Sequence, residues 1–190
     1  MQLIFATNNL HKLEEVQSLL KNHPIKSLKD IKCIEEIPET SDTIEGNALQ
    51  KARYVNQKYH VDCFADDTGL EVESLGGKPG VYSARYAGEH KSSEDNIQKI
   101  LTELNGIQNR KAQFKTVIAL IVNEREFLFE GITSGNIIES PKGLNGFGYD
   151  SIFVPDGFNK SYAEMAFEEK NRYSHRAMAV KKLNQFLSNF

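Results

Sequence analysis

The 190-residue sequence has only two cysteines, no excess of basic residues and no long hydrophobic run. Cys33 and Cys63 match no metal-binding spacing, and no basic, apolar and small-residue signal pattern opens the chain, so we expect a reducing, cytoplasmic location. No run approaches the roughly 20 apolar residues that a membrane-spanning helix needs. With 23 basic and 26 acidic residues, the formal net charge is −3. We therefore expect no membrane and no nucleic acid as partner, and an anionic ligand must be held locally.

Internal repeats, low-complexity tracts and a clear linker are also absent. A chain of this length can bury most of its unfolded surface, either as one ordinary core or as one core pinched into two lobes. We expect a single domain over residues 1–190.

The hydrophobic pattern alternates between short strands and amphipathic helices, as in an α/β protein. Asn123 and Glu124 form the expected turn of a long hairpin, and Ser174 is the expected N-cap of the last helix. The predicted strands cover 2–6, 62–66, 112–122 and 125–138, and the predicted helices cover 10–20, 43–59, 92–104 and 174–190.

The first strand-to-helix turn contains Thr7, Asn9 and Lys12. Amide groups at a helix N-terminus, with a lysine one turn in, can bind phosphate oxygens. The glycines of a P-loop are missing. On these residues alone, a capped helix with a solvated lysine is the favoured interpretation.

Asp66 and Asp67 stand side by side where the second predicted strand ends. Neighbouring strand residues point to opposite faces, so one aspartate can face a ligand while the other fixes the following turn. Glu39 and Glu45 are further oxygen ligands, and Mg²⁺ typically takes one or two carboxylates together with substrate phosphates. A plain Asp-Asp-Thr-Gly turn is the alternative.

Two further motifs lie in the C-terminal part of the chain. The stretch GLNGFGYD (143–150) allows close backbone approach and offers the Phe147 and Tyr149 rings for stacking on a flat base. Several cationic or hydrogen-bond-donating side chains stand at the expected start of the last helix, namely Lys170, His175 and Arg176. The helix dipole disfavours positive charge at this end of a helix. A structural loop and a structural helix start are the alternatives.

Taken in order, FATNNLHKLEEV, FADDTGLEVESLGGKPGVYSARYAG, GLNGFGYDSIFVP and SHRAMAV resemble the inosine triphosphate pyrophosphatase family, the enzymes that act on non-canonical purine nucleotides. The resemblance extends over nearly the whole chain. It implies an α/β fold of the Maf/Ham1 type, with a long twisted mixed β-sheet, flanking helices and two lobes around a nucleotide cleft. It also implies a homodimer and Mg²⁺-dependent hydrolysis of ITP, dITP and XTP to the monophosphate and pyrophosphate.

The resemblance also implies roles for individual residues. Asp67 is the implied proton acceptor, and Glu39 and Asp67 are the implied Mg²⁺ ligands, while Asp66 is expected to fix the turn. Phe147 is the implied stacking ring, and Lys170, His175 and Arg176 are implied to bind the base and its 6-oxo group. The full implied substrate-binding set is Thr7, Asn8, Asn9, Leu10, His11, Lys12, Lys51, Thr68, Phe147, Gly148, Tyr149, Asp150, Lys170, His175 and Arg176.

Two positions depart from the family pattern. Gly46 stands where many relatives carry an acid beside Glu45, and Asn8 replaces a smaller residue in the phosphate turn. A related pyrophosphatase for pyrimidine or modified nucleotides is the nearest alternative. A nucleotide-sensing protein without turnover is another alternative, and the presence of Lys12, Glu39, Asp67 and Lys51 argues against it.

Overall fold

A computed structural model of the chain describes residues 3–189, which fall into two compact units. Unit 1 comprises Met1–Asp67, Thr116–Gly131 and His175–Phe190. Unit 2 comprises Thr68–Lys115 and Ile132–Ser174. That both units act as a single domain stays a prediction.

Six strands form one mixed sheet in the order β2-β1-β3-β4-β5-β6. Strand β1 pairs in parallel with β2 and β3, whereas β6 pairs antiparallel to β5. Strands β3, β4 and β5 each contribute residues to both units. The strands are β1 (Leu3–Phe5), β2 (Ile25–Ser27), β3 (Cys63–Val72), β4 (Lys111–Val122), β5 (Arg125–Ile137) and β6 (Phe153–Pro155).

Five α-helices accompany this sheet within the described residues. Three of them begin with a side-chain cap, in which Asn9, Thr43 and Ser92 accept a hydrogen bond from the first helical turn. The helices are α1 (Leu10–Leu19), α2 (Ile44–Tyr59), α3 (Ser93–Glu103), α4 (Phe167–Tyr173) and α5 (His175–Ser188). The expected mixed sheet with flanking helices is therefore confirmed.

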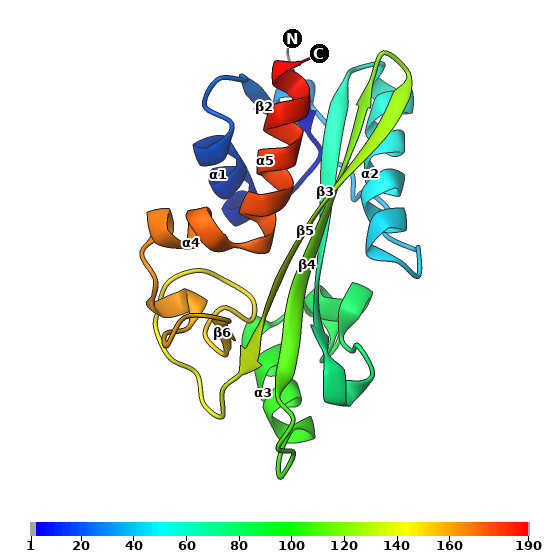
Figure 1. The fold of residues 1–190 in the computed structure, drawn as a ribbon. Helices are drawn as coiled ribbons and strands as arrows, with labels where there is room; N and C mark the ends of the chain where they lie inside the picture. The colour runs from blue at the N-terminus through cyan, green and yellow to red at the C-terminus, as the bar shows by residue number, and fades with distance from the viewer. Residues whose placement is uncertain (1–2, 190) are drawn as a thin grey trace. The chain divides into compact units, whose positions relative to one another are not determined.

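In unit 1, α1 and α5 lie side by side on one face of the sheet and α2 lies on the other (Figure 1). The core under α1 and α5 includes Phe5 and Phe64, whose rings stack at 4.6 Å on neighbouring strands. On the other face, α2 buries Ala48, Ala52 and Val55 completely. Side chains of β3 therefore face α1 and α5 at one position and α2 at the next.

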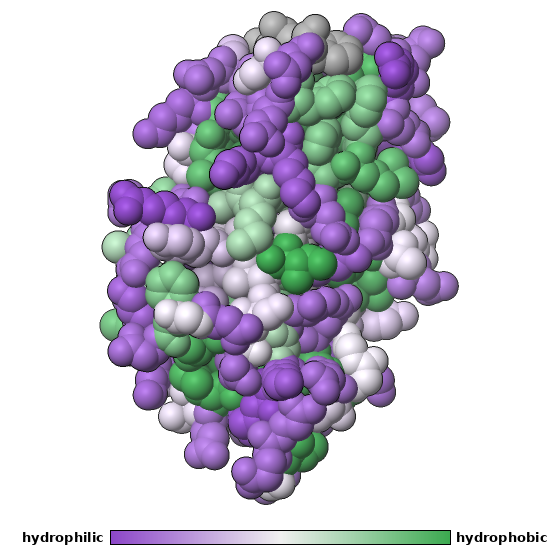
Figure 2. All heavy atoms as spheres, in the orientation of Figure 1, coloured by the Kyte–Doolittle hydropathy of each residue, from purple (hydrophilic) through white to green (hydrophobic). Residues whose placement is uncertain are grey.

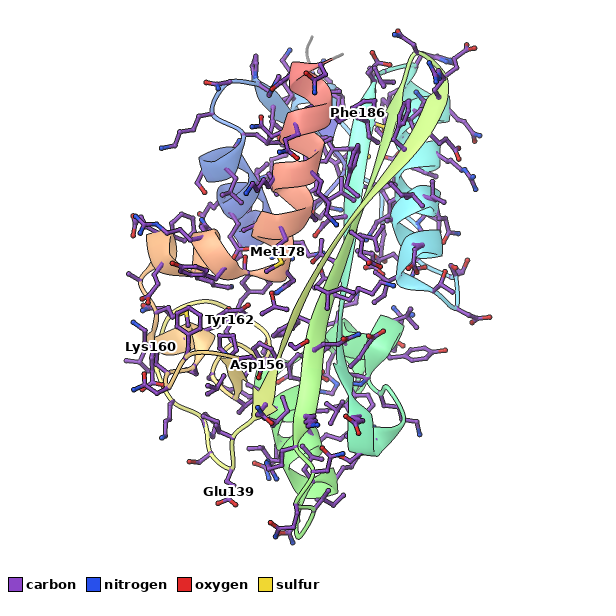
Figure 3. All side chains as sticks on the ribbon, viewed as in Figure 1. Glu139, Asp156, Lys160, Tyr162, Met178 and Phe186 are labelled. Carbon is purple, nitrogen blue, oxygen red and sulfur yellow. The ribbon has the colours of Figure 1, made fainter. Side chains whose placement is uncertain are left out.

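The C-terminal half of α5 packs on the β4–β5 hairpin through aromatic rings. Phe186 points toward the hairpin in Figure 3, with its ring 4.5 Å from that of Phe127 and 5.5 Å from that of Phe129. These rings are only partly buried. A hydrophobic area is accordingly visible between α5 and the hairpin on the face drawn in Figure 2.

The N-terminal end of α5 approaches β5 closely at Gly131. A Cβ atom at this position would lie 2.0 Å from the His175 carbonyl oxygen and 2.6 Å from the Ala179 nitrogen. Only glycine fits without a shift of backbone, because both neighbours are main-chain atoms. Gly131 therefore determines how closely the segment with His175 and Arg176 lies to the sheet.

Unit 2 has its own core between α3 and the strand segments that belong to this unit. Ile100 and Leu104 of α3 pack with Phe114, Phe153 and other buried residues. Tyr162, labelled in Figure 3, joins this core, with its ring 5.2 Å from that of Phe153. This core supports the loop 143–150 and helix α4.

Most elements agree with the sequence predictions, and the hairpin turn at Asn123 and Glu124 is confirmed, both residues having positive φ. Strands β2 and β6 and helix α4 were not predicted. The prediction that a strand ends at Asp66 is wrong, because β3 continues to Val72 and contains the whole Asp-Asp-Thr-Gly run. Lys170 lies in α4 and not at the start of the last helix. Of the first predicted strand, Gln2 lies outside the described residues, as does Phe190 of the last helix.

Candidate active site

The turn between β1 and α1 has the form expected of an anion-binding turn. The Thr7 hydroxyl accepts from the Asn9 nitrogen at 3.2 Å, and the Asn9 side chain accepts from the Lys12 nitrogen at 3.2 Å. Asn8, Asn9, Leu10 and His11 are exposed. The first-turn amides of α1 lack partners within the helix itself, so this end can receive phosphate oxygens.

Asp66 lies on the face of β3 that is covered by α1 and α5. Its carboxylate accepts from Lys12 Nζ at 3.1 Å and from Arg176 Nε at 3.2 Å. The side chain of Asp66 is completely buried. Its partners thus include two cations of other elements, and Asp66 lies within β3 and not in the turn that we expected it to fix.

Asp67 lies on the opposite face, toward α2. It accepts from Lys51 Nζ at 3.3 Å and from the Asn47 side-chain amide at 3.3 Å, both donors being on α2. Lys51 also forms an ion pair with Glu39. One buried ammonium group therefore joins the two carboxylates that the family resemblance assigns to Mg²⁺.

The loop that carries Glu39 is fastened to α2 by side-chain amides. Asn47 accepts from the Ser41 nitrogen at 2.9 Å while it donates to Asp67. Gln50 accepts from the Thr40 nitrogen at 2.8 Å and donates to the Thr40 hydroxyl at 2.9 Å. Asn47 thus links the Glu39 loop to Asp67, a role that no sequence motif indicated.

The two adjacent aspartates have opposite pKa shifts. For Asp66, burial would raise the pKa, but Lys12, Arg176 and Lys51 outweigh it and lower the pKa to about 2. For Asp67, burial dominates over Lys51 and Lys12, and its pKa is raised above the ordinary value. Two carboxylates whose pKa values are separated in this way can serve different roles. Asp67 is the better proton acceptor of the pair.

The two lysines also differ. Burial lowers the pKa of Lys12 despite the attraction of Asp66. Burial would lower the pKa of Lys51 too, but Asp67, Glu39 and Asp66 together outweigh it and raise its pKa. Lys51 is therefore held as a cation between two carboxylates.

Loop 143–150 and α4 form a second cluster, within unit 2. The Asp150 carboxylate accepts from the Phe147 nitrogen at 2.9 Å and from Lys170 Nζ at 2.6 Å. Lys170 Nζ lies 4.9 Å from the centre of the Phe147 ring. The structure thus brings Phe147, Asp150 and Lys170 together, as a fixed cation beside an aromatic face.

Other predicted substrate contacts lie close by in the chain. Tyr149 is buried in the core of unit 2, where its hydroxyl donates to the Ser83 carbonyl oxygen at 2.8 Å. Gly148 has a φ of +59°, a conformation that glycine adopts without strain. Thr68 follows Asp67 in β3 and is half-buried. Their contacts with substrate stay predictions.

His175 and Arg176 begin α5 and are almost completely buried. Arg176 donates from Nε to Asp66 and from Nη1 to Glu15, so its guanidinium is engaged by two carboxylates. Glu15 was missed by the sequence predictions. Its signal was available: an acid three residues after Lys12 and beside Val16 lies in phase with the buried face of α1.

Comparisons with known proteins place these motifs in a family. The model of the Ham1 family matches residues 3–186. The chain belongs to the Ham1 family. It is 55% identical over 99% of its length to a dITP/XTP pyrophosphatase of Flavobacterium johnsoniae, covering 98% of that protein. It is 56% identical to the dITP/XTP pyrophosphatase of Flavobacterium psychrophilum, with full coverage of both chains.

Solved Ham1 structures share the fold. The Ham1 protein of Staphylococcus aureus matches with a TM-score of 0.91 and 36% identity, covering 100% of this chain and 99% of that one. A HAM1 protein of Coxiella burnetii matches equally well, with a TM-score of 0.91 and 36% identity over the whole of both chains. The predicted family and fold are therefore confirmed.

Among residues 3–189, no helix is both long and apolar enough to cross a membrane. Within the same residues there is no group of three or more His, Cys, Asp or Glu side chains placed to hold a metal ion.

Proposed function

We propose that this Ham1-family chain hydrolyses the non-canonical purine nucleotides ITP, dITP and XTP to the monophosphate and pyrophosphate. The observation that carries this proposal is the cluster in which Lys51 joins Glu39 and Asp67. The names of the curated relatives support the same activity.

Lys12, Lys51 and the amides of residues 7–12 bind the triphosphate in this proposal. Both lysines are largely buried, so their charges act on phosphate oxygens with little screening by water. An ammonium group in such surroundings stabilises the charge that develops on a departing pyrophosphate. Cleavage between the α- and β-phosphates follows, because the pyrophosphate is held as a unit.

Asp67 accepts the proton of the attacking water. In the protein without bound metal, burial raises the pKa of Asp67 above that of an ordinary aspartate, and the carboxylate lies beside the cation of Lys51. The Asn47 amide, which donates to the other carboxylate oxygen, fixes the orientation of the group.

The residues present fit a magnesium ion. Glu39 and Asp67 offer hard carboxylate oxygens on two elements joined by Lys51, and Mg²⁺ is commonly held by two carboxylates and substrate phosphates. When bound, Mg²⁺ neutralises charge on the phosphate oxygens. The Lys51 ammonium, which contacts one oxygen of each carboxylate, offsets the repulsion between Glu39 and Asp67.

Phe147 and Lys170 select the base. The Phe147 ring offers a stacking face, and the Lys170 ammonium, held by Asp150, donates to a 6-oxo group. His175 is a second donor to that oxygen. The 6-amino group of adenine is itself a donor, and a buried donor without an acceptor costs roughly 1–3 kcal/mol. Two such mismatches would favour ITP over ATP by about 10² or more.

Product analysis across nucleoside triphosphates tests this function. With ITP and XTP, monophosphate and pyrophosphate should form in equal amounts, and ATP and UTP should react far more slowly. Orthophosphate and a diphosphate as first products would exclude the proposed cleavage. Fastest turnover of UTP would favour a pyrimidine enzyme, and no turnover of any substrate would favour a nucleotide sensor.

A homodimer in the cytoplasm is part of the same proposal. Its support is the family resemblance. Light scattering coupled to size-exclusion chromatography should give twice the mass of one chain. A mass of one chain at micromolar concentration would exclude a stable dimer.

A further inference from the structure

Three buried charged side chains and one partly exposed lysine form a row within unit 1. Lys12 Nζ contacts Asp66 at 3.1 Å, Asp66 contacts Arg176 Nε at 3.2 Å, and Arg176 Nη1 contacts Glu15. The side chains of Asp66, Arg176 and Glu15 are between 0% and 4% exposed, whereas that of Lys12 is 14% exposed. Only the Lys12 end of this charge row therefore reaches solvent.

The charges alternate along the row. Glu15 and Asp66 are the acids, and Arg176 and Lys12 are the bases, so the four formal charges cancel. Burying a charged side chain costs desolvation free energy, and attraction to oppositely charged neighbours must compensate for this cost. If Glu15 were neutral, Arg176 would lose one of its carboxylate partners, and Asp66 would face Arg176 and Lys12 with less support.

The row joins three separate elements: Lys12 and Glu15 are on α1, Asp66 is on β3 and Arg176 is on α5. Lys12 and Glu15 are three residues apart and so share one face of α1. Arg176 uses the two edges of its guanidinium group for two different carboxylates, which fixes its plane. Glu15 thereby determines where Arg176 meets Asp66, and Asp66 determines where the Lys12 ammonium lies.

We propose that Glu15 is a positioning residue for phosphate binding, acting through Arg176 and Asp66 on Lys12. The proposal rests on the proposed function only in that Lys12 binds phosphate. It also gives Arg176 a role on the phosphate side of the substrate, which differs from the base contact that the family resemblance implies. Without the Glu15 charge, Asp66 moves toward Arg176 and Lys12 loses its fixed position.

A double-mutant cycle with a ligand that has no base tests this proposal. Binding of inorganic tripolyphosphate in the presence of Mg²⁺ is measured by calorimetry for the parent, Glu15→Gln, Lys12→Met and the double variant. Glu15→Gln should weaken binding by about tenfold, which corresponds to about 1.4 kcal/mol. In the Lys12→Met background, Glu15→Gln should have no further effect, because its action passes through Lys12.

Independent, additive effects of the two substitutions would overturn the proposal, as would unchanged binding in either single variant. If Glu15→Gln does not fold, Glu15→Asp replaces it, because the shorter side chain keeps the charge but draws the carboxylate away from Arg176. Glu15→Asp should weaken tripolyphosphate binding in the parent and have no effect in the Lys12→Met background, and equal effects in both would overturn the proposal. Glu126→Gln is the matched control, because it removes a carboxylate from the exposed Arg53 ion pair and should leave tripolyphosphate binding unchanged.

The ratio of kcat/KM for ITP to that for ATP distinguishes a role of Arg176 in phosphate binding from a role in contacting the base. Glu15→Gln should lower kcat/KM for ITP and for ATP by the same factor, since Lys12 meets the phosphates that both share. A narrowed ratio of ITP to ATP would mean that the row acts on the base and would overturn the proposal. Tripolyphosphate binding does not require turnover, so a failure of the proposed pyrophosphatase activity would be recognised separately.

Discussion

Asp66 and Asp67 are neighbours in β3, yet their surroundings differ in almost every respect. Asp66 faces α1 and α5, is completely buried and has a pKa near 2 between two cations. Asp67 faces α2, is partly accessible and has a raised pKa. Because neighbouring side chains of a strand point to opposite faces of the sheet, two identical residues take different roles. Asp66 is a buried partner of two cations, and Asp67 is a candidate base.

The difference indicates that the two faces of the sheet have different roles, one in stability and one in the proposed catalysis. On the Asp66 face, charges are balanced within the protein itself. On the Asp67 face, two carboxylates share the ammonium of Lys51, and the remaining formal charge of −1 can attract a divalent cation.

Replacing Asp66 should cost the most stability. Asp66→Asn leaves Lys12 and Arg176 buried with one carboxylate fewer, and breaking a buried ion pair typically costs about 3–5 kcal/mol. Urea unfolding should show this loss, while the control Glu126→Gln should change the free energy of unfolding by no more than about 1 kcal/mol. Equal losses of stability in the two variants would contradict the claim that the ion pairs of Asp66 contribute more than an exposed ion pair.

Replacing Asn47 should weaken metal binding. Asn47→Ala removes the amide that links Asp67 to the Glu39 loop, and partners of metal ligands are commonly worth about 10–100-fold in affinity. Calorimetric titration with Mg²⁺ should show this decrease. Gln50→Ala, which loosens the same loop without touching Asp67, should have a smaller effect. The opposite order would mean that the loop, and not Asp67, limits metal binding.

Acid should remove the contribution of Asp66 to stability. Its pKa is about 2 in the folded protein and 3.8 ordinarily, so the folded state favours the ionised form. This contribution, about 2 kcal/mol, is fully present above pH 3.8 and is lost as the pH falls toward 2. Carbon-13 NMR of the carboxyl group should show a titration midpoint well below 3.8. A midpoint at or above that value would contradict the proposed charge balance.

Replacing Gly131 should lower the stability of the protein moderately, because this residue lies where β5 and α5 approach each other closely. Gly131→Ala places a methyl group against the backbone of α5, and overpacking of this kind costs about 1–3 kcal/mol. Ser134→Ala, at an exposed position of the same strand, should change stability by no more than about 0.5 kcal/mol. Thermal unfolding of both variants measures the difference. Equal melting temperatures would show that α5 adjusts freely.

The sequence was informative wherever local pattern determines structure. Periodicity and capping residues predicted α1, α2, α3 and the β4–β5 hairpin, because each depends on neighbouring residues. The short β2 and β6 were missed because three residues carry too little periodicity. The predicted strand ended too early, at Asp66, because two adjacent aspartates are typical of a turn. Their burial in β3 depends on cationic partners that are distant in sequence.

The same limit applies to the candidate site. Motifs pointed to Lys12, Glu39 and Asp67, whose residue types suit phosphate and metal. They did not point to Glu15 or Asn47, whose importance comes from partners 161 and 20 residues away. A buried charge in phase with an apolar helix face is a signal for such residues, but its partner is visible only in the folded chain.

Turnover and stability of Asp67→Asn, measured together, test the central claim most directly. The substitution keeps the size of the side chain and removes the charge that burial disfavours. Pyrophosphate release from ITP at saturating Mg²⁺ should fall by about 10² or more, the usual value of a dominant electrostatic contribution. The midpoint of urea unfolding should stay the same or rise. Near-parent turnover, or a loss of stability as large as that of Asp66→Asn, would contradict the division of labour between the two aspartates.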